Sequence, residues 1–243
     1  MLLGCLSLYA ADNDLITRQI TITLEKAGTL PDRIASSKKN KITNLKIIGE
    51  INGTDLRMIR EMAGSNSNGN STDGKLSVLD LSEAKIVKGG DCYLNNGYDY
   101  TSNDVIGSRA FLGCSGLTSL TLPADITSIG DEAFQGCSGL TSIYVYEEKV
   151  PIIGSNVFKG CDAKKCTVYV PMGTYNDYRL SEFGDYFENI VEFDVTGIDK
   201  TTTSTDIEEV ARYSVNGQRL SAPTKGLNIV KYSNGSVKKV AVR

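Results

Sequence analysis

Two stretches of the chain are nearly identical. Residues 106–119 read IGSRAFLGCSGLTS and residues 129–142 read IGDEAFQGCSGLTS, so eleven of fourteen positions match at a spacing of 23 residues. A third copy, IGSNVFKGC, begins at Ile153, 24 residues after the start of the second copy. A fixed period in this range is typical of a solenoid, in which each repeat is one structural unit stacked on the next.

Each copy contains a short strand pattern. Residues 117–122 (LTSLTL) and 140–145 (LTSIYV) end in the alternation of a strand with one buried face. The same pattern occurs at residues 42–47 and 76–81, and again at 168–171 with a shift of one residue. We therefore expect five stacked rungs between about residues 40 and 171.

The second apolar run of each copy has a spacing of three to four residues, which predicts one turn of helix on the return side. Stacking would place equivalent residues in two columns, one of phenylalanines and one of cysteines: Phe111, Phe134, Phe158, Cys114, Cys137 and Cys161. Because the chain has no histidine and no Cys-x-x-Cys pair, we interpret these cysteines as buried free thiols rather than as metal ligands. A local disulfide between Cys161 and Cys166 is an alternative if the chain is exported.

The block I-G-x-x-A-F-x-G-C-x-x-L resembles the BspA-like leucine-rich repeats of bacterial surface proteins, from Lys41 to about Phe193. The resemblance implies a leucine-rich-repeat solenoid of short parallel strands with short helical or irregular return segments. The tail CTVYVPMGTYNDY…FENIVEF resembles the segment that closes such arrays and covers the last sheet edge. The resemblance also implies adhesion to a protein, matrix or glycan partner.

The chain outside the strand patterns predicts a cap at each end of the array. Residues 11–40 are the N-terminal cap, in which Pro31 suits a first helical turn. The repeats occupy residues 41–171 with two long loops, and residues 172–195 are the C-terminal cap. We expect a helix within residues 174–189 of that cap, with four apolar contacts: Tyr175, Tyr178, Leu180 and Phe183.

Residues 1–10 (MLLGCLSLYA) are apolar and are followed at once by polar residues. This change resembles the end of a secretory signal cleaved at Ala11, which predicts an exported protein at the cell surface or outside the cell. Residues 2–5 also resemble a lipoprotein box, with Cys5 as the lipidated residue. A buried N-terminal strand is the third interpretation, and we favour plain export.

The C-terminal part of the chain has a different composition. Residues 196–208 are rich in Thr, Asp and Ser and predict a linker. Residues 209–243 predict a small antiparallel β module, because Asn216-Gly217 and Asn234-Gly235 favour hairpin turns between alternating runs. This module resembles the sorting or anchoring modules of exported bacterial proteins, with Asn228 in place of the usual tyrosine. The module has three possible roles: it is an active sorting module, a degenerate remnant of one, or a spacer.

The composition excludes several functions. The net charge is −3 and no basic run exceeds a few residues, so the chain lacks the clustered positive charge expected of a nucleic-acid-binding protein. No stretch approaches the roughly 18 apolar residues of a membrane span, which leaves a lipid anchor or the sorting-like module as the expected membrane link. A histidine-based triad is excluded, and no phosphate-binding loop follows a strand. We expect a monomer that is no enzyme and needs no cofactor. A carbohydrate-active enzyme with Asp131-Glu132 or Glu147-Glu148 is the remaining alternative.

Two surfaces are candidate ligand sites. Stacked rungs would align outward-facing strand residues in one row that suits an extended peptide or a glycan: Lys46, Asp80, Thr121, Tyr144 and Tyr169. The loop Gly89–Asp104 offers rigid aromatic contacts in Tyr93, Tyr98 and Tyr100. Its acids lack the spacing of a calcium loop, so we interpret it as a surface insertion. Two hypotheses compete with ligand binding. In one, the outward-facing residues are ordinary strand-forming residues on a solvated face, and in the other the protein is a structural spacer without a ligand.

Overall fold

The computed structural model describes residues 14–194, 209–214, 218–220, 222, 224–232 and 237–242. Four features predicted from the sequence lie outside these residues: the leader 1–10 with Cys5, the linker 196–208, and the turns Asn216-Gly217 and Asn234-Gly235. The chain divides into two compact units, Met1–Val195 and Thr196–Arg243, which are described separately.

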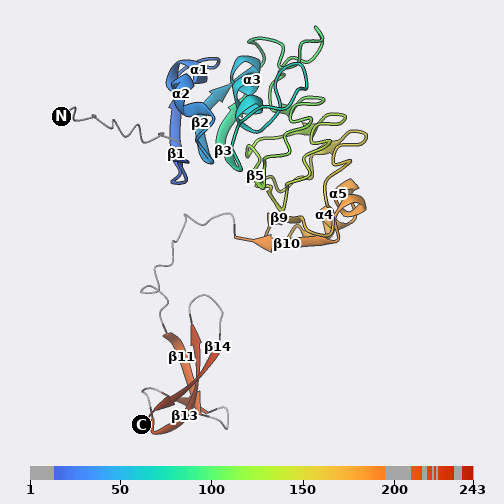
Figure 1. Cartoon of the computed structure of the whole chain (residues 1–243). Helices are drawn as coiled ribbons and strands as arrows, with labels where there is room; N and C mark the ends of the chain where they lie inside the picture. Colours follow the sequence, from blue (N-terminus) through green and yellow to red (C-terminus); the bar gives the residue numbers. More distant parts are fainter. Residues whose placement is uncertain are drawn as a thin grey trace, which may run out of the picture. The chain divides into compact units, whose positions relative to one another are not determined.

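The first unit is built on a seven-stranded parallel sheet whose strand order follows the chain. The strands are β1 (Ile20–Leu24), β2 (Asn44–Ile51), β3 (Val78–Ile86), β5 (Ser119–Thr121), β7 (Ser142–Tyr144), β9 (Thr167–Pro171) and β10 (Asn189–Phe193). Figure 1 shows β1, β2, β3 and β5 side by side, with the loops on the far side of the sheet. This arrangement confirms the predicted solenoid of short parallel strands.

Equivalent apolar positions of the repeats pair across this sheet. Leu79 lies opposite Leu120, Leu120 opposite Ile143, and Ile143 opposite Val168. All four side chains have no exposed surface. Because side chains alternate between the two faces of a strand, the residues on either side of each position lie on the opposite, open face.

A second, narrow parallel sheet runs along the return side and consists of β4 (Val105–Ile106), β6 (Ser128–Ile129) and β8 (Ile152–Ile153). Consecutive turns follow each of these strands, so the predicted turn of helix is wrong. Arg109, Glu132 and Asn156 have left-handed backbones with φ of 59°, 58° and 55°. A left-handed residue interrupts a right-handed helix and lets the N–H groups of the turn point toward the next rung.

In each of the first two return turns, three N–H groups donate to three carbonyl groups of the next turn. The pairs are Arg109 to Asp131, Phe111 to Ala133, Gly113 to Gln135, Glu132 to Ser155, Phe134 to Val157 and Gly136 to Lys159, at 2.7–2.9 Å. The turns therefore lie very close together. A Cβ atom at Gly130 would lie 2.5 Å from the backbone nitrogen of Ser108, which explains the glycine of the repeated Ile-Gly pair.

Side chains replace the missing N–H donors at the first return turn. The carbonyl groups of Ser108, Ala110 and Leu112 occupy the repeat positions whose counterparts in the later turns accept N–H bonds. In the described part of the chain, no return turn precedes the first one in the array to donate these bonds. The Tyr93 hydroxyl donates to Ser108 at 2.8 Å, and the Arg60 guanidinium donates to Ala110 at 2.9 Å and to Leu112 at 3.1 Å. Tyr93 is 1% exposed, so its predicted role as a surface contact is wrong. The hydroxyl is buried because it donates one of the first hydrogen bonds in the ladder that links successive return turns.

Aromatic side chains form a continuous stack inside the array. The ring centroids of Phe111 and Phe134 are 5.3 Å apart, and those of Phe134 and Phe158 are 5.4 Å apart, with nearly parallel planes. Offset aromatic contacts of this kind add about 0.5–1.5 kcal/mol each beyond area burial. The phenylalanine column therefore ties each rung to its neighbours.

The N-terminal cap contains α1 (Leu30–Arg33) and α2 (Ser36–Lys39), and α3 (Gly53–Met62) follows β2 in the first rung of the array. Pro31 lies in the first turn of α1, as the sequence predicts. Asn52 caps α3, and the buried Asp55 carboxylate accepts backbone N–H bonds from Gly28 at 2.5 Å, Leu30 at 2.8 Å and Asn52 at 2.9 Å. One carboxylate thus joins the start of α3 to the cap segment.

The C-terminal cap contains two short helices, α4 (Tyr175–Arg179) and α5 (Glu182–Tyr186), where one helix was predicted. Ser181 separates them, because its hydroxyl accepts from the Phe183 N–H and caps α5. Tyr178 and Phe183 are buried as expected. Tyr175 and Leu180 are 41% and 88% exposed, so their prediction as apolar contacts is wrong.

The second unit is a four-stranded antiparallel sheet in the order β12-β11-β13-β14, with β11 (Glu209–Ser214), β12 (Arg219–Leu220), β13 (Gly226–Tyr232) and β14 (Val237–Val242). The predicted antiparallel module is therefore confirmed. Asn228 is buried, and its amide exchanges hydrogen bonds of 3.1 and 2.8 Å with the backbone of Thr224. Its Oδ1 also accepts from the Arg212 guanidinium at 3.1 Å. Asn228 therefore fixes the chain just before β13.

Candidate functional site: the open face of the parallel sheet

The open face carries one side chain per rung in register. The strand pairing places five residues successively opposite one another: Lys46, Asp80, Thr121, Tyr144 and Tyr169. Each is partly exposed, unlike its neighbours on the core side. The sequence thus locates this row correctly within the fold, and its role in ligand binding stays a prediction.

Four aromatic side chains gather at the C-terminal end of this face, and we name them the aromatic patch: Tyr144, Tyr146, Tyr169 and Phe193. The rings of Tyr144 and Tyr169 stack with centroids 4.4 Å apart and planes 7° apart. Phe193 contacts Tyr144 and Tyr146 edge-on, at 5.8 and 5.1 Å between centroids. Partial burial, with the neighbouring tyrosines, raises the pKa of Tyr144, so its phenol stays protonated at neutral pH.

Two members of the aromatic patch were not predicted. Tyr146 lies two residues after Tyr144, so the period of a strand already carries a signal for it. Phe193 belongs to β10, which follows the two cap helices. The register of β10 against β9 depends on how the two cap helices return the chain to the sheet. The repeat pattern does not predict this return.

Charged residues occupy the other end of the face, and we name Lys46, Asp80 and Glu83 the charged cluster. The Lys46 ammonium lies 2.7 Å from the Glu83 carboxylate and 3.4 Å from the Asp80 carboxylate. The hydrogen bond to Glu83 is the main cause that raises the pKa of Lys46, so the lysine stays charged. Two carboxylates share one ammonium, which leaves the cluster with a formal charge of −1.

The loop Gly89–Asp104 is attached to the rest of the first unit by its own polar groups. Asp91 and Thr54 exchange hydrogen bonds of 3.0 and 3.1 Å, and Asp99 forms a two-point ion pair with Arg109 at 3.0 and 3.1 Å. Tyr98 and Tyr100 remain available, since they are 84% and 51% exposed. The loop therefore offers two of its three predicted aromatic contacts to a partner.

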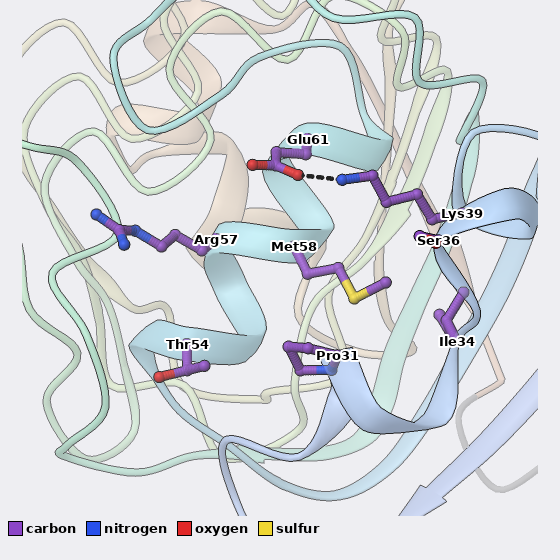
Figure 2. A pocket seen from close by; sticks show the side chains of 8 residues that line it. All are labelled: Pro31, Ile34, Ser36, Lys39, Thr54, Arg57, Met58 and Glu61. Carbon is purple, nitrogen blue, oxygen red and sulfur yellow. Dashed lines mark hydrogen bonds and ion pairs between the residues drawn. The ribbon is translucent and has the colours of Figure 1, made fainter.

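The first unit also has a cavity of about 300 Å³ between the α1–α2 segment and α3. Figure 2 shows Met58 extending toward Pro31 and Ile34, while the Lys39 and Glu61 side chains meet above it in an ion pair. Arg57 points away and donates to Asn95 of the loop. Lys39 and Glu61 thus neutralise each other, and Arg57 has an amide partner, so we interpret the cavity as a seam between the cap and the array.

The array cysteines are placed as inert thiols. Cys114 and Cys137 are fully buried, and burial raises the pKa of Cys114 to about 12 and that of Cys137 well above its usual value. The Cys137 thiol donates to the Phe111 carbonyl at 3.1 Å. Cys161 is half-buried, burial raises its pKa to about 11, and it and Cys166 are both free thiols here. A nucleophilic role would need a thiolate, which these surroundings disfavour.

The carboxylates considered for hydrolysis lie at the surface, with Asp131 and Glu148 exposed and Glu132 and Glu147 partly exposed. Asp131 accepts a backbone N–H from Ser155 at 2.7 Å and lies at a shallow polar hollow on the return side, beside Glu132 and Arg109. Among the described residues, no group of three or more His, Cys, Asp or Glu side chains is placed to hold a metal ion. None of the helices in these residues has the length and apolar character that a membrane crossing requires.

The parallel sheet with one short strand per repeat, together with the stacked return turns, defines the leucine-rich-repeat class of solenoids. The family model described as BspA type leucine rich repeat region, in six copies, matches residues 104–212. The repeats in this part of the chain are therefore of the BspA leucine-rich-repeat type, which confirms the resemblance of the sequence motifs there. Comparison with curated proteins finds none that matches the chain.

Proposed function

We propose that this is an exported, non-enzymatic bacterial surface protein that binds a partner protein through the open face of its parallel sheet. The family supports a surface role, and residues 1–10 support export, by cleavage at Ala11 or with a lipid on Cys5. The observation that carries the proposal is the aromatic patch. Four aromatic rings from successive rungs lie together on a face that the core does not need.

The geometry of the patch favours protein over glycan. Tyr144 and Tyr169 are stacked face to face at 4.4 Å, so each ring covers one face of the other. A sugar packs best on a free aromatic face, whereas apolar side chains also pack against exposed ring edges. Tyrosine and phenylalanine are enriched in the cores of protein interfaces. A glycan ligand therefore remains an outcome of the test and not its expected result.

The test is a screen of the labelled full-length chain against arrays of extracellular proteins and of glycans. A Tyr144→Ala/Tyr169→Ala variant should lose at least about tenfold in affinity for the partner, because central aromatic residues carry much of the energy of an interface. Ile152→Ala is the matched control, since Ile152 is 77% exposed on the return sheet. Unchanged binding by the double tyrosine variant would contradict the proposal, and loss in Tyr98→Ala/Tyr100→Ala alone would move the site to the loop.

A structural role is the second candidate, and the separate second unit favours it. In this role the repeats present or protect a partner while residues 209–243 provide the attachment. Removal of residues 196–243 should then change where the protein is found in cell fractions. An unchanged location would remove the support for this alternative.

A further inference from the structure

The charged cluster and the aromatic patch lie on the same face of the same sheet. Asp80 on β3, Thr121 on β5 and Tyr144 on β7 are direct register partners. Neighbouring strands are about 4.8 Å apart, so Asp80 and Tyr144 are separated by roughly 10 Å and Asp80 and Tyr169 by roughly 14 Å along the row. The intervening rung presents the small side chain of Thr121, with the small Ser119 beside it.

The charges of the cluster are incompletely balanced. Lys46 holds Asp80 at 3.4 Å and Glu83 at 2.7 Å, so two carboxylates face one ammonium. The Glu83 side chain is 56% exposed, which leaves its carboxylate accessible to a second cation. A positive group on a partner would complete the neutralisation, whereas a negative group would be repelled.

We propose that the open face binds an extended segment of a partner protein in which a lysine or arginine lies four residues from an apolar or aromatic side chain. This inference rests on the proposed function. The basic side chain binds beside Asp80 and Glu83, and the apolar side chain packs against Tyr144, Tyr169 and Phe193. The separation follows because an extended chain rises about 3.3 Å per residue and its side chains alternate between two sides. Residues four apart therefore point to the same side and span about 13 Å.

The experiment uses the labelled full-length chain and an array of Gly/Ser-based peptides, each with one arginine and one phenylalanine at separations of one to six residues. Binding should be strongest at a separation of four and weaker at three, where the two side chains point to opposite sides of an extended chain. Replacement of the arginine by glutamine, or addition of salt, should weaken binding by about three- to tenfold, as expected for a partly exposed ion pair.

Variants of the protein separate the two parts of the site. Glu83→Gln should remove the preference for arginine over glutamine and leave binding of the neutral peptide unchanged. Asp80→Asn should act in the same direction, although Asp80 also accepts from Ser82, so Glu83→Gln is the decisive variant. Asp73→Asn, an exposed acid in the loop 64–74, is the matched control.

Two negative outcomes remain distinguishable. If peptides bind in a way that depends on Tyr144 and Tyr169, yet without preference for arginine or for separation, the inference is overturned and the proposed function stands. If no peptide or protein depends on Tyr144 and Tyr169, both are overturned.

Discussion

The guanidinium of Arg60 donates a 2.9 Å hydrogen bond to the carbonyl oxygen of Ala110, fifty residues further along the chain. Arg60 also donates to the carbonyls of Arg109 and Leu112, at 3.0 and 3.1 Å, and has no exposed surface. With the Tyr93 hydroxyl, it supplies the donors that a preceding return turn would supply. The hydrogen bonds that link successive return turns therefore start from side-chain donors at the N-terminal end of the array.

Replacement of Arg60 by methionine should lower the free energy of unfolding by about 3 kcal/mol, because several buried carbonyl groups lose their donor at once. The measurement is urea unfolding followed by circular dichroism. Arg18→Met, at an exposed arginine, is the control and should change stability by less than about 0.5 kcal/mol. Equal effects of the two substitutions would contradict the capping role of Arg60.

Tyr93→Phe removes one hydroxyl and keeps the ring. The Ser108 carbonyl then loses its 2.8 Å donor inside the fold, so we expect a loss of about 1 kcal/mol in unfolding free energy. Tyr98→Phe in the same loop should have no effect, since Tyr98 is 84% exposed. If Tyr93→Phe is as neutral as Tyr98→Phe, the hydroxyl contributes nothing to the ladder.

Phe134 and Phe193 should separate stability from binding. Phe134 is fully buried between two rings, so Phe134→Ala should cost about 3–5 kcal/mol in unfolding free energy. Phe193 lies half-buried on the open face, and Phe193→Ala should reduce partner binding while changing stability by about 1 kcal/mol or less. Thermal unfolding and binding titrations of both variants provide the comparison, and a reversed order of the stability effects would rule out this assignment.

Alkaline pH should destabilise the array through its buried thiols. Burial raises the pKa of Cys114 from 9.0 to about 12, so the unfolded thiol ionises above pH 9 while the folded thiol does not. Its contribution to stability is complete below pH 9 and is lost as the pH rises toward 12, at about 1.4 kcal/mol per pH unit. Unfolding free energies measured across this window should therefore fall less steeply in Cys114→Ala than in the wild type.

A buried apolar substitution provides the control for the pH experiment. Leu117→Ala, close to Cys114 in the sequence and fully buried, should lower stability at every pH without changing its slope. The thiol would be excluded as the origin of the alkaline loss if Cys114→Ala kept the wild-type slope.

Residues 14–194 should fold without the second unit. The parallel sheet, both caps and the phenylalanine column all belong to Met1–Val195. A chain that ends at Asp194 should therefore keep a single cooperative unfolding transition in urea, with the slope expected for its size. A broad or absent transition would show that the array depends on residues 196–243.

The repeated part of the chain was the most predictable. The strand positions, the phenylalanine column and the outward row from Lys46 to Tyr169 all follow from one period, because each rung repeats the contacts of its neighbour. The same reasoning failed at the return turns. Their apolar spacing matches a helix, but left-handed residues such as Glu132 direct the N–H groups to the next rung instead.

The sequence by itself therefore determined the solenoid, its register and the family, since a period fixes which residues become neighbours. The tertiary structure alone decided the segments that have no second copy. It buried Tyr93, exposed Tyr175 and Leu180, placed Arg60 on the first return turn and brought Phe193 to Tyr144. These contacts join residues whose separation follows no repeat, and only packing of the caps against the finished array selects them.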